Sequence, residues 1–236
     1  MNQELIKKNA LENKLTAPLK RRTFIKYAGM TAGAVGLIAV GCKESDNVTT
    51  TTGVDLGSGD TGILNYAYAL EQLEAAFYTT VVSNAAFTTT FSAKEQAILK
   101  DIRDHEIVHR EFFKTALGAK AIQNLEVDFS TINFANRDSV LTTARTFEDL
   151  GVSAYNGAGN LLVDANLLLV AGKVVSVEGR HAAAIRDLLN PKSADFSGDN
   201  VIDASGLDGA KTPIVVLAAA APFIKTKINA SNLPTS

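Results

Sequence analysis

Hydrophobic positions recur with the spacing of α-helices over most of this chain. Apolar residues alternate at steps of three and four over four segments, residues 61–83, 93–117, 139–159 and 165–189. A shorter apolar segment begins at Thr212–Pro213, a cap residue followed by proline at the first helical position. No segment alternates long enough to predict a strand. The pattern therefore predicts an all-α bundle of four long amphipathic helices with a short fifth helix toward the C-terminus.

Local motifs mark several helix ends. Ser92 and Glu95 form the sequence of a capping box, in which each side chain satisfies a backbone N–H at the start of a helix. Gly118 follows the same helix, where glycine is favoured just beyond the last turn. Asp164 precedes the fourth long helix and Pro191 stops it. These motifs support the helix boundaries that the hydrophobic pattern predicts.

The four long helices carry a tandem repeat of polar residues. The first and third helices each contain a glutamate followed seven residues later by a tyrosine: Glu71 and Tyr78, Glu148 and Tyr155. The second and fourth each contain a glutamate followed three residues later by a histidine: Glu106 and His109, Glu178 and His181. Seven residues are close to two helical turns and three are close to one, so the members of each pair share a helix face.

The repeated glutamates lie on the apolar faces of the helices. Burying an ionised carboxylate without a partner costs several kcal/mol, so four of them need compensation. Two divalent cations would neutralise four carboxylates and leave the two imidazoles as neutral ligands. We therefore predict a site for two metal ions. A set of solvated surface residues is the alternative, and the position of the residues on the apolar faces disfavours it.

This ligand pattern resembles the di-iron and di-manganese carboxylate proteins of the ferritin-like superfamily. The segments LNYAYALEQLEAAFY, IRDHEIVHREFF, FEDLGVSAYNGA and EGRHAAAIRDLL resemble bacterial ferritin-like-domain proteins related to desiccation-related proteins. The resemblance covers about residues 61–225 and implies a ferritin-like four-helix bundle domain over residues 61–230.

The resemblance also implies a role for each repeated residue. Glu106 and Glu178 would bridge the two metal ions. One end of the pair would be completed by Glu71 with His109, and the other by Glu148 with His181. The two tyrosines, Tyr78 and Tyr155, would lie behind the ligands. Glutamate and histidine suit both iron and manganese, so the residues do not distinguish the two metals.

Three further features stay open at this stage. Glu74 also faces the inner side of the first helix, but the parallel with the third helix selects Glu71 as the ligand and leaves Glu74 as a neighbour or extra ligand. His105 either supports the ligands from behind or is an ordinary histidine at the edge of the core. Residues 195–208 loosely resemble a calcium loop, but position 6 is Asn200 and position 12 is Gly206, so a polar connection is favoured.

The first 42 residues have the features of an export signal. A basic segment contains Arg21 and Arg22 followed by Thr-Phe-Ile-Lys, which resembles a twin-arginine signal. The apolar run from Tyr27 to Val40 is too short to span a bilayer as a helix and is typical of a signal peptide. Cys42, the only cysteine, ends a segment that resembles a lipoprotein processing site. We expect an exported protein, in the periplasm or at the outer membrane, attached to a membrane by a lipid on Cys42.

Charge and composition narrow the function further. Residues 43–60 are small and polar, as in a flexible tether. Beyond residue 42 the chain carries 16 Lys/Arg and 23 Asp/Glu, and this acidic balance argues against nucleic-acid binding.

The resemblance to the ferritin-like superfamily implies redox chemistry with dioxygen or peroxide, of ferroxidase or peroxide-detoxifying type. The alternative is a metal-binding or stress-protective lipoprotein without turnover. Homo-oligomers are compatible with either function, but a lipid on every subunit fits a closed ferritin cage poorly.

Overall fold

A computed structural model of this protein describes residues 53–198 and 200–235. The described residues form six α-helices: α3 (Gly59–Ser83), α4 (Phe87–Thr90), α5 (Ala93–Leu117), α6 (Arg137–Gly159), α7 (Ala165–Leu189) and α8 (Pro213–Ala220). They are accompanied by short 3₁₀ turns and by two strands of two residues each, β1 (Val54–Asp55) and β2 (Ile228–Asn229). The all-α prediction is confirmed. The predicted signal, with Arg21, Arg22 and Cys42, lies outside the described residues.

The observed helices agree closely with the predicted segments. Helices α5 and α7 have the predicted bounds, and α3 begins two residues earlier. Helix α6 also begins two residues earlier than predicted, because the side chain of Asn136 caps it by accepting a hydrogen bond from the Ser139 N–H. The short helix α4 was not predicted, since four residues are too few to show a helical period.

The predicted capping motifs are present in the structure. Both hydrogen bonds of the capping box between Ser92 and Glu95 form at the start of α5. Gly118 ends this helix with a φ of 55°, a conformation that favours glycine. The carboxylate of Asp164 accepts the N–H of Asn166 at the start of α7. Local chemistry therefore sets the ends of both helices that carry the Glu-x-x-His motif.

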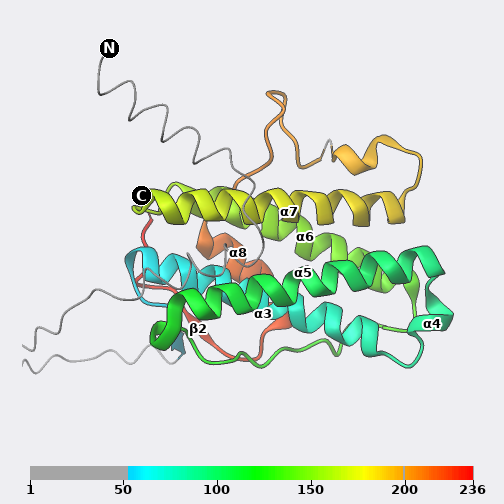
Figure 1. Ribbon diagram of the computed structural model, residues 1–236, viewed down its shortest axis with the longest axis horizontal. Helices are drawn as coiled ribbons and strands as arrows, with labels where there is room; N and C mark the ends of the chain where they lie inside the picture. Colours follow the sequence, from blue (N-terminus) through cyan, green and yellow to red (C-terminus); the bar gives the residue numbers. More distant parts are fainter. Residues whose placement is uncertain (1–52, 199, 236) are drawn as a thin grey trace, which may run out of the picture. The chain divides into compact units, whose positions relative to one another are not determined.

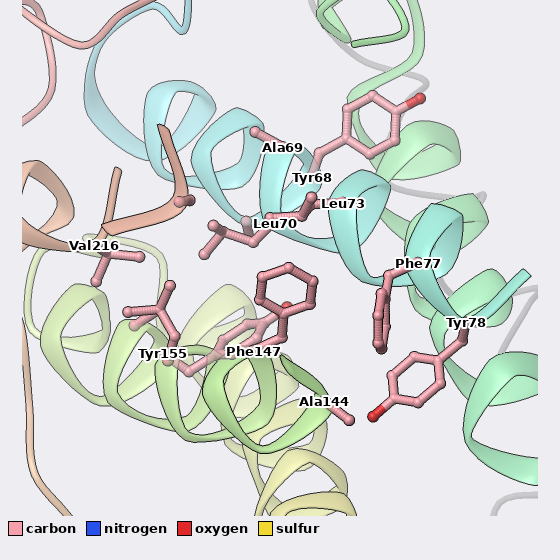
Figure 2. Packing of buried hydrophobic residues seen from close by; sticks show 14 of the residues in the cluster. Tyr68, Ala69, Leu70, Leu73, Phe77, Tyr78, Ala144, Phe147, Tyr155 and Val216 are labelled. Carbon is pink, nitrogen blue, oxygen red and sulfur yellow. The ribbon is translucent and has the colours of Figure 1, made fainter. Parts of the chain in front are cut away.

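The four long helices pack as two consecutive pairs. Helix α3 packs along α5 and α6 packs along α7, while α3 also contacts α6 and α5 contacts α7 (Figure 1). Aromatic rings fill the space between the pairs. Figure 2 shows Phe77 between Tyr78 and Phe147, and its ring centroid lies 5.1 Å from that of each of them. The resulting core is lined by buried apolar residues from all four long helices.

The long connection between α5 and α6 is held against α3 by two buried amides. The side chain of Asn65 donates to the carbonyl oxygen of Lys120 and accepts the N–H of Ile122, each at 3.0 Å. Two turns further along α3, Gln72 accepts the N–H of Leu125 at 2.8 Å. Because these amides lie seven residues apart on one helix face, the connection runs along α3 and leaves the interior of the bundle to the repeated residues.

The two ends of the described chain meet in a small parallel sheet. Strand β1 pairs with β2, with Val54 opposite Ile228. Leu56 is fully buried, so the last part of the predicted tether, residues 53–60, packs on the domain and begins α3. The remainder of that tether lies outside the described residues. None of the described helices combines the length and the apolar character that crossing a membrane requires.

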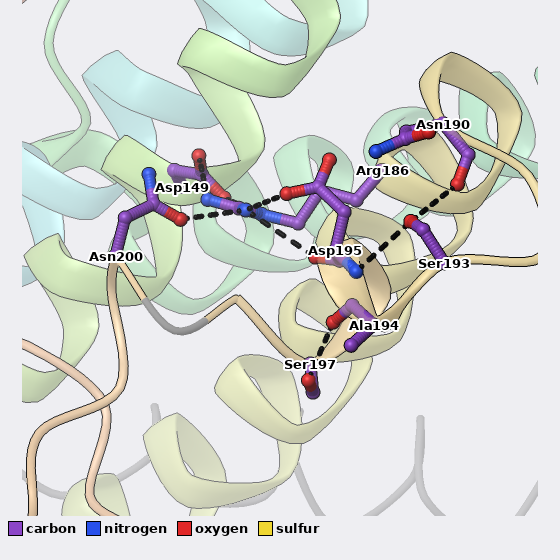
Figure 3. A network of polar contacts seen from close by, with 8 residues as sticks. All are labelled: Asp149, Arg186, Asn190, Ser193, Ala194, Asp195, Ser197 and Asn200. Atoms are coloured by element: carbon purple, nitrogen blue, oxygen red, sulfur yellow. Dashed lines mark hydrogen bonds and ion pairs between the residues drawn. The ribbon is translucent and has the colours of Figure 1, made fainter.

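A buried arginine helps to attach the segment between α7 and α8 to the bundle. The guanidinium of Arg186 donates two hydrogen bonds to the carboxylate of Asp149, at 2.9 and 2.6 Å, and another to Asn200 at 3.0 Å (Figure 3). It also contacts Asp195, the first residue of the sequence that resembles a calcium loop. Asp203 of that sequence accepts two backbone N–H groups of its own turn. The carboxylate of Asp195 therefore helps to attach the loop to the bundle, and the carboxylate of Asp203 closes a turn within the loop.

Candidate metal centre

Six side chains from the four long helices converge inside the bundle. They form two groups in which one carboxylate oxygen or imidazole nitrogen from each residue lies within 4.8 Å of those from the others. The first group consists of Glu71, Glu106, His109 and Glu178, and the second of Glu106, Glu148, Glu178 and His181. Two glutamates belong to both groups and so lie between them. The structure thus brings together all six residues that the repeat singled out.

Each histidine lies closest to the glutamate of the opposite Glu-x-x-His helix. The Nδ1 atom of His109 in α5 is 2.9 Å from Oε1 of Glu178 in α7. The Nδ1 atom of His181 in α7 is 2.7 Å from Oε1 of Glu106 in α5. All four glutamates are fully buried, and the side chain of His109 is only 12% exposed. The histidine of each Glu-x-x-His motif therefore contacts the glutamate of the other motif across the bundle.

Glu71 and Glu148 close the two ends of the cluster. The Oε2 atom of Glu71 is 3.5 Å from Nδ1 of His109, and Oε2 of Glu148 is 3.5 Å from Nδ1 of His181. Helices α3 and α6 thus supply one carboxylate each, and α5 and α7 supply a carboxylate and an imidazole each. The geometry has the same two-fold repeat as the sequence.

Two tyrosines hold the outer oxygens of the end glutamates. The hydroxyl of Tyr78 in α3 donates to Oε1 of Glu148 in α6 at 2.5 Å, and Tyr155 in α6 donates to Oε1 of Glu71 in α3. Burial and the nearby carboxylates raise the pKa of both tyrosines well above its ordinary value. Both hydroxyls therefore keep their protons and act as donors. The sequence placed each tyrosine on the face of its own helix's glutamate, whereas each one serves the glutamate of the other helix.

The inner atoms of the cluster lack hydrogen-bond partners. Among the described residues, nine buried side-chain nitrogen and oxygen atoms have none, and eight of these belong to the cluster: Oε2 of Glu71 and Glu148, both carboxylate oxygens of Glu106 and Glu178, and Nδ1 of His109 and His181. The histidine–carboxylate approaches are charge contacts without hydrogen-bond geometry. Buried polar atoms without partners are costly, and two bound cations would satisfy all eight. The residues present therefore fit a pair of metal ions.

Burial and the facing charges together set the protonation of the cluster. Burial acts to lower the pKa of His109 and His181, but the facing carboxylates outweigh it and raise both pKa values. Burial raises the pKa of Glu106 to about 8, and the charge of Glu178 adds to the rise. Protons on these groups therefore balance the carboxylates when no metal ion does. Cations and protons compete for the same atoms.

Glu74 lies outside both ligand groups. It is 4% exposed, and its Oε1 atom faces Gly151 of α6, where an added Cβ would lie 3.1 Å away. Burial and then the charge of Glu106 raise its pKa well above the ordinary value. In the tandem repeat Gly151 is the counterpart of Glu74, because it follows Glu148 by three residues as Glu74 follows Glu71. The tandem repeat indicates the position of this glycine, although glycine has no side chain that would mark it as part of a site.

His105 contacts a histidine of the cluster directly. Its Nδ1 atom is 2.9 Å from Nε2 of His181, and the two rings are stacked with an interplanar angle of 13°. Of the two roles left open by the sequence, this geometry corresponds to support of the cluster from outside. The side chain of His105 is itself exposed, so it connects the cluster with the surface.

An apolar pocket of about 30 Å³ adjoins one end of the cluster. Tyr155 lines it together with Tyr66, whose hydroxyl is the ninth buried atom without a partner. Apolar side chains of all four long helices complete the lining, among them Leu70, Phe113 and Val170. The pocket has room for about two waters or a diatomic molecule, judged by the volume that one water needs.

The family of the chain follows from this fold and a sequence comparison. A family model described as a ferritin-like domain matches residues 59–191, from the first residue of α3 to just beyond α7. The chain belongs to this ferritin-like domain family. No curated protein matches the chain. The buried glutamate and histidine cluster is compatible with the di-metal site of a ferritin-like bundle.

Proposed function

We propose that this protein binds two iron or manganese ions between α3, α5, α6 and α7 and uses them for redox chemistry with dioxygen or peroxide. The observation that carries the proposal is the set of eight buried ligand atoms without hydrogen-bond partners. Four carboxylates match the charge of two divalent cations, and mixed nitrogen and oxygen ligands suit both metals.

The residues of the cluster would have different roles in holding the metal pair. Glu106 and Glu178 would bridge the ions, because both belong to the two ligand groups. Tyr78 and Tyr155 hold the outer oxygens of Glu148 and Glu71, so the inner oxygens would be free to hold the ions. Full burial of the carboxylates keeps bulk water away and strengthens their attraction for cations.

A metal pair of this kind would supply two electrons, one from each ion, which with two protons reduce dioxygen to hydrogen peroxide or hydrogen peroxide to two waters. The apolar pocket beside Tyr155 has room for such small oxidants. The proposal therefore covers ferroxidase and peroxide-detoxifying chemistry. Both begin with a reduced metal pair and a small oxidant, and repeated turnover requires fresh Fe²⁺ or an external reductant to replace the two electrons.

Metal analysis and anaerobic reoxidation test the proposal. The full-length protein, matured in cells supplied with iron and manganese, is expected to contain two metal ions per chain. After anaerobic loading with Fe²⁺, addition of dioxygen or hydrogen peroxide should oxidise the bound iron faster than free Fe²⁺, and Glu106→Ala should abolish the effect. A stable protein that binds no metal would refute the proposal. Two bound ions that are oxidised no faster than free Fe²⁺ would instead support the non-catalytic alternative.

We further propose that the protein acts in the cell envelope as a lipoprotein exported by the twin-arginine route. The sequence around Arg21 and Arg22 and the cysteine at position 42 support this location. Folded export would allow the metal pair to be loaded in the cytoplasm. Cys42→Ser is expected to release the protein from the membrane fraction, and Arg21→Lys with Arg22→Lys to retain it in the cytoplasm. Unchanged fractionation of both variants would contradict the proposal.

A further inference from the structure

His105 lies at the surface end of a hydrogen bond that reaches the metal cluster. Its Nδ1 atom is 2.9 Å from Nε2 of His181, and the ring centroids are 5.2 Å apart. The other ring nitrogen of His181, Nδ1, faces the cluster at 2.7 Å from Glu106. His181 is buried and His105 is exposed. A second imidazole therefore links this half of the cluster to the protein surface.

The direction of the hydrogen bond follows from the nitrogen that faces the cluster. A cation at Nδ1 of His181 occupies the lone pair of that atom, so the ring proton is on Nε2. The Nε2–H group then donates to Nδ1 of His105, which carries its own proton on the opposite nitrogen. An acceptor in this place fixes the tautomer and orientation of a histidine ligand and increases its basicity.

Among the residues that the structure describes, none is an equivalent acceptor for the other half of the cluster. In the tandem repeat, Val177 precedes Glu178 as His105 precedes Glu106. Valine has no side-chain atom that accepts a hydrogen bond. Within residues 53–198 and 200–235, the polar contacts of the His109 ring are made by Nδ1 with carboxylates, and none is made by Nε2. The two histidines therefore have matching inner contacts and different outer ones.

We propose that His105 is a positioning residue that makes the two metal positions unequal. The position formed by Glu106, Glu148, Glu178 and His181 binds its ion more tightly and fills first. The inference rests on the metal pair of the proposed function but requires no reaction with an oxidant. Outer partners of histidine ligands typically contribute 10- to 100-fold in metal affinity, so loss of this acceptor is expected to weaken the tighter position by about tenfold.

Anaerobic titration of the full-length protein with Co²⁺ tests this inference, because the visible absorption of Co²⁺ reports each binding step. The wild type is expected to show a tight step and a weaker one. His105→Phe keeps an aromatic ring for stacking but offers no acceptor, and it should weaken the tight step by about tenfold. His105→Gln offers an amide oxygen and should retain most of the affinity. Val177→Ala, at the matching position of α7, is the control and should alter neither step.

A spectroscopic measurement separates the hydrogen bond from a general structural effect. In the Co²⁺-loaded protein, the Nε2–H proton of His181 should exchange with solvent more slowly than that of His109, and His105→Phe should remove the difference. This comparison is made in the wild type alone if the variant does not fold.

The outcomes distinguish the inference from the function on which it rests. Two equal Co²⁺ steps in the wild type, an unchanged tight step in His105→Phe, or equal exchange rates of the two protons would each overturn the inference and leave the metal pair intact. A wild-type protein that binds no Co²⁺ would overturn the proposed metal centre itself.

Discussion

The hydroxyl of Tyr78 in α3 donates a 2.5 Å hydrogen bond to Glu148 in α6, 70 positions further along the chain. In the opposite direction, the hydroxyl of Tyr155 in α6 donates to Glu71 in α3. The two crossed hydrogen bonds join the first helix pair to the second at the level of the metal cluster. They also determine which oxygen of each end glutamate remains free for a cation.

Tyr78→Phe is expected to destabilise the metal-free protein by about 1–3 kcal/mol, because it leaves Oε1 of Glu148 buried without a donor. Urea denaturation of the purified protein measures the change. Tyr68→Phe is the matched control on α3, since the Tyr68 hydroxyl points away from Tyr78 and Tyr155 (Figure 2), and it should change the stability by less than about 0.5 kcal/mol. Equal effects of the two substitutions would contradict the structural role of the crossed hydrogen bonds.

Glu106→Gln is expected to have little effect in the absence of metal and to remove the stabilisation that metal provides. In the metal-free protein, burial raises the pKa of Glu106 to about 8, so at pH 7 an amide replaces a largely neutral carboxyl group and the fold is retained. With Mn²⁺ added at 100 times the dissociation constant, the wild type should gain about 2.7 kcal/mol of stability that the variant lacks. Thermal unfolding with and without Mn²⁺ measures both effects. Glu111→Gln, at an exposed position of α5, should behave as the wild type does.

Metal binding is expected to release protons and to strengthen as the pH rises. The facing carboxylates raise the pKa of His109 and His181 despite their burial, so both imidazoles are protonated at neutral pH in the metal-free protein. A cation must displace these protons, so higher pH favours binding. Calorimetric titration in two buffers of different ionisation enthalpy counts the released protons. An observed enthalpy that is independent of the buffer would show that the imidazoles are already neutral.

Gly157→Ala is expected to destabilise the domain strongly. A Cβ atom at this position of α6 would lie 1.8 Å from the carbonyl oxygen of Lys211. Lys211 is held in place because its N–H donates to the carbonyl oxygen of Ser153, which lies one turn before Gly157 in α6. Relief of this overlap requires a backbone shift that costs about 1–3 kcal/mol or more. Gly172→Ala in α7 has open space around its added Cβ and should instead stabilise the helix by about 0.5–1 kcal/mol. Chemical denaturation of the two variants should show changes of opposite sign.

Most of the bundle could be predicted from local information. The bounds of α5 and α7 followed from the hydrophobic period and from capping residues such as Ser92 and Asp164, because each capping hydrogen bond joins residues close in sequence. The start of α6 was misplaced by two residues because Asn136 provides its cap. Asp138 lies two residues further on and is also a favoured capping residue, and only the backbone conformation selects one of them.

The candidate site could be predicted as a set of residues but not as a network. The repeat selected Glu71 over Glu74, and the structure places Glu71 in a ligand group and Glu74 outside both, against Gly151. The contact of His105 with His181 joins residues 76 positions apart, and no spacing rule links them. Such pairings depend on how each helix is rotated about its axis.

The sequence by itself determined the helices, the tandem repeat and the six residues of the cluster, because helical period and motif spacing are properties of single segments. Only the tertiary structure decided that the tyrosines cross between α3 and α6 and that His105 supports one histidine and not the other. These relationships depend on the rotation and separation of helices distant along the chain, which core packing sets and the spacing of residues within one helix does not encode.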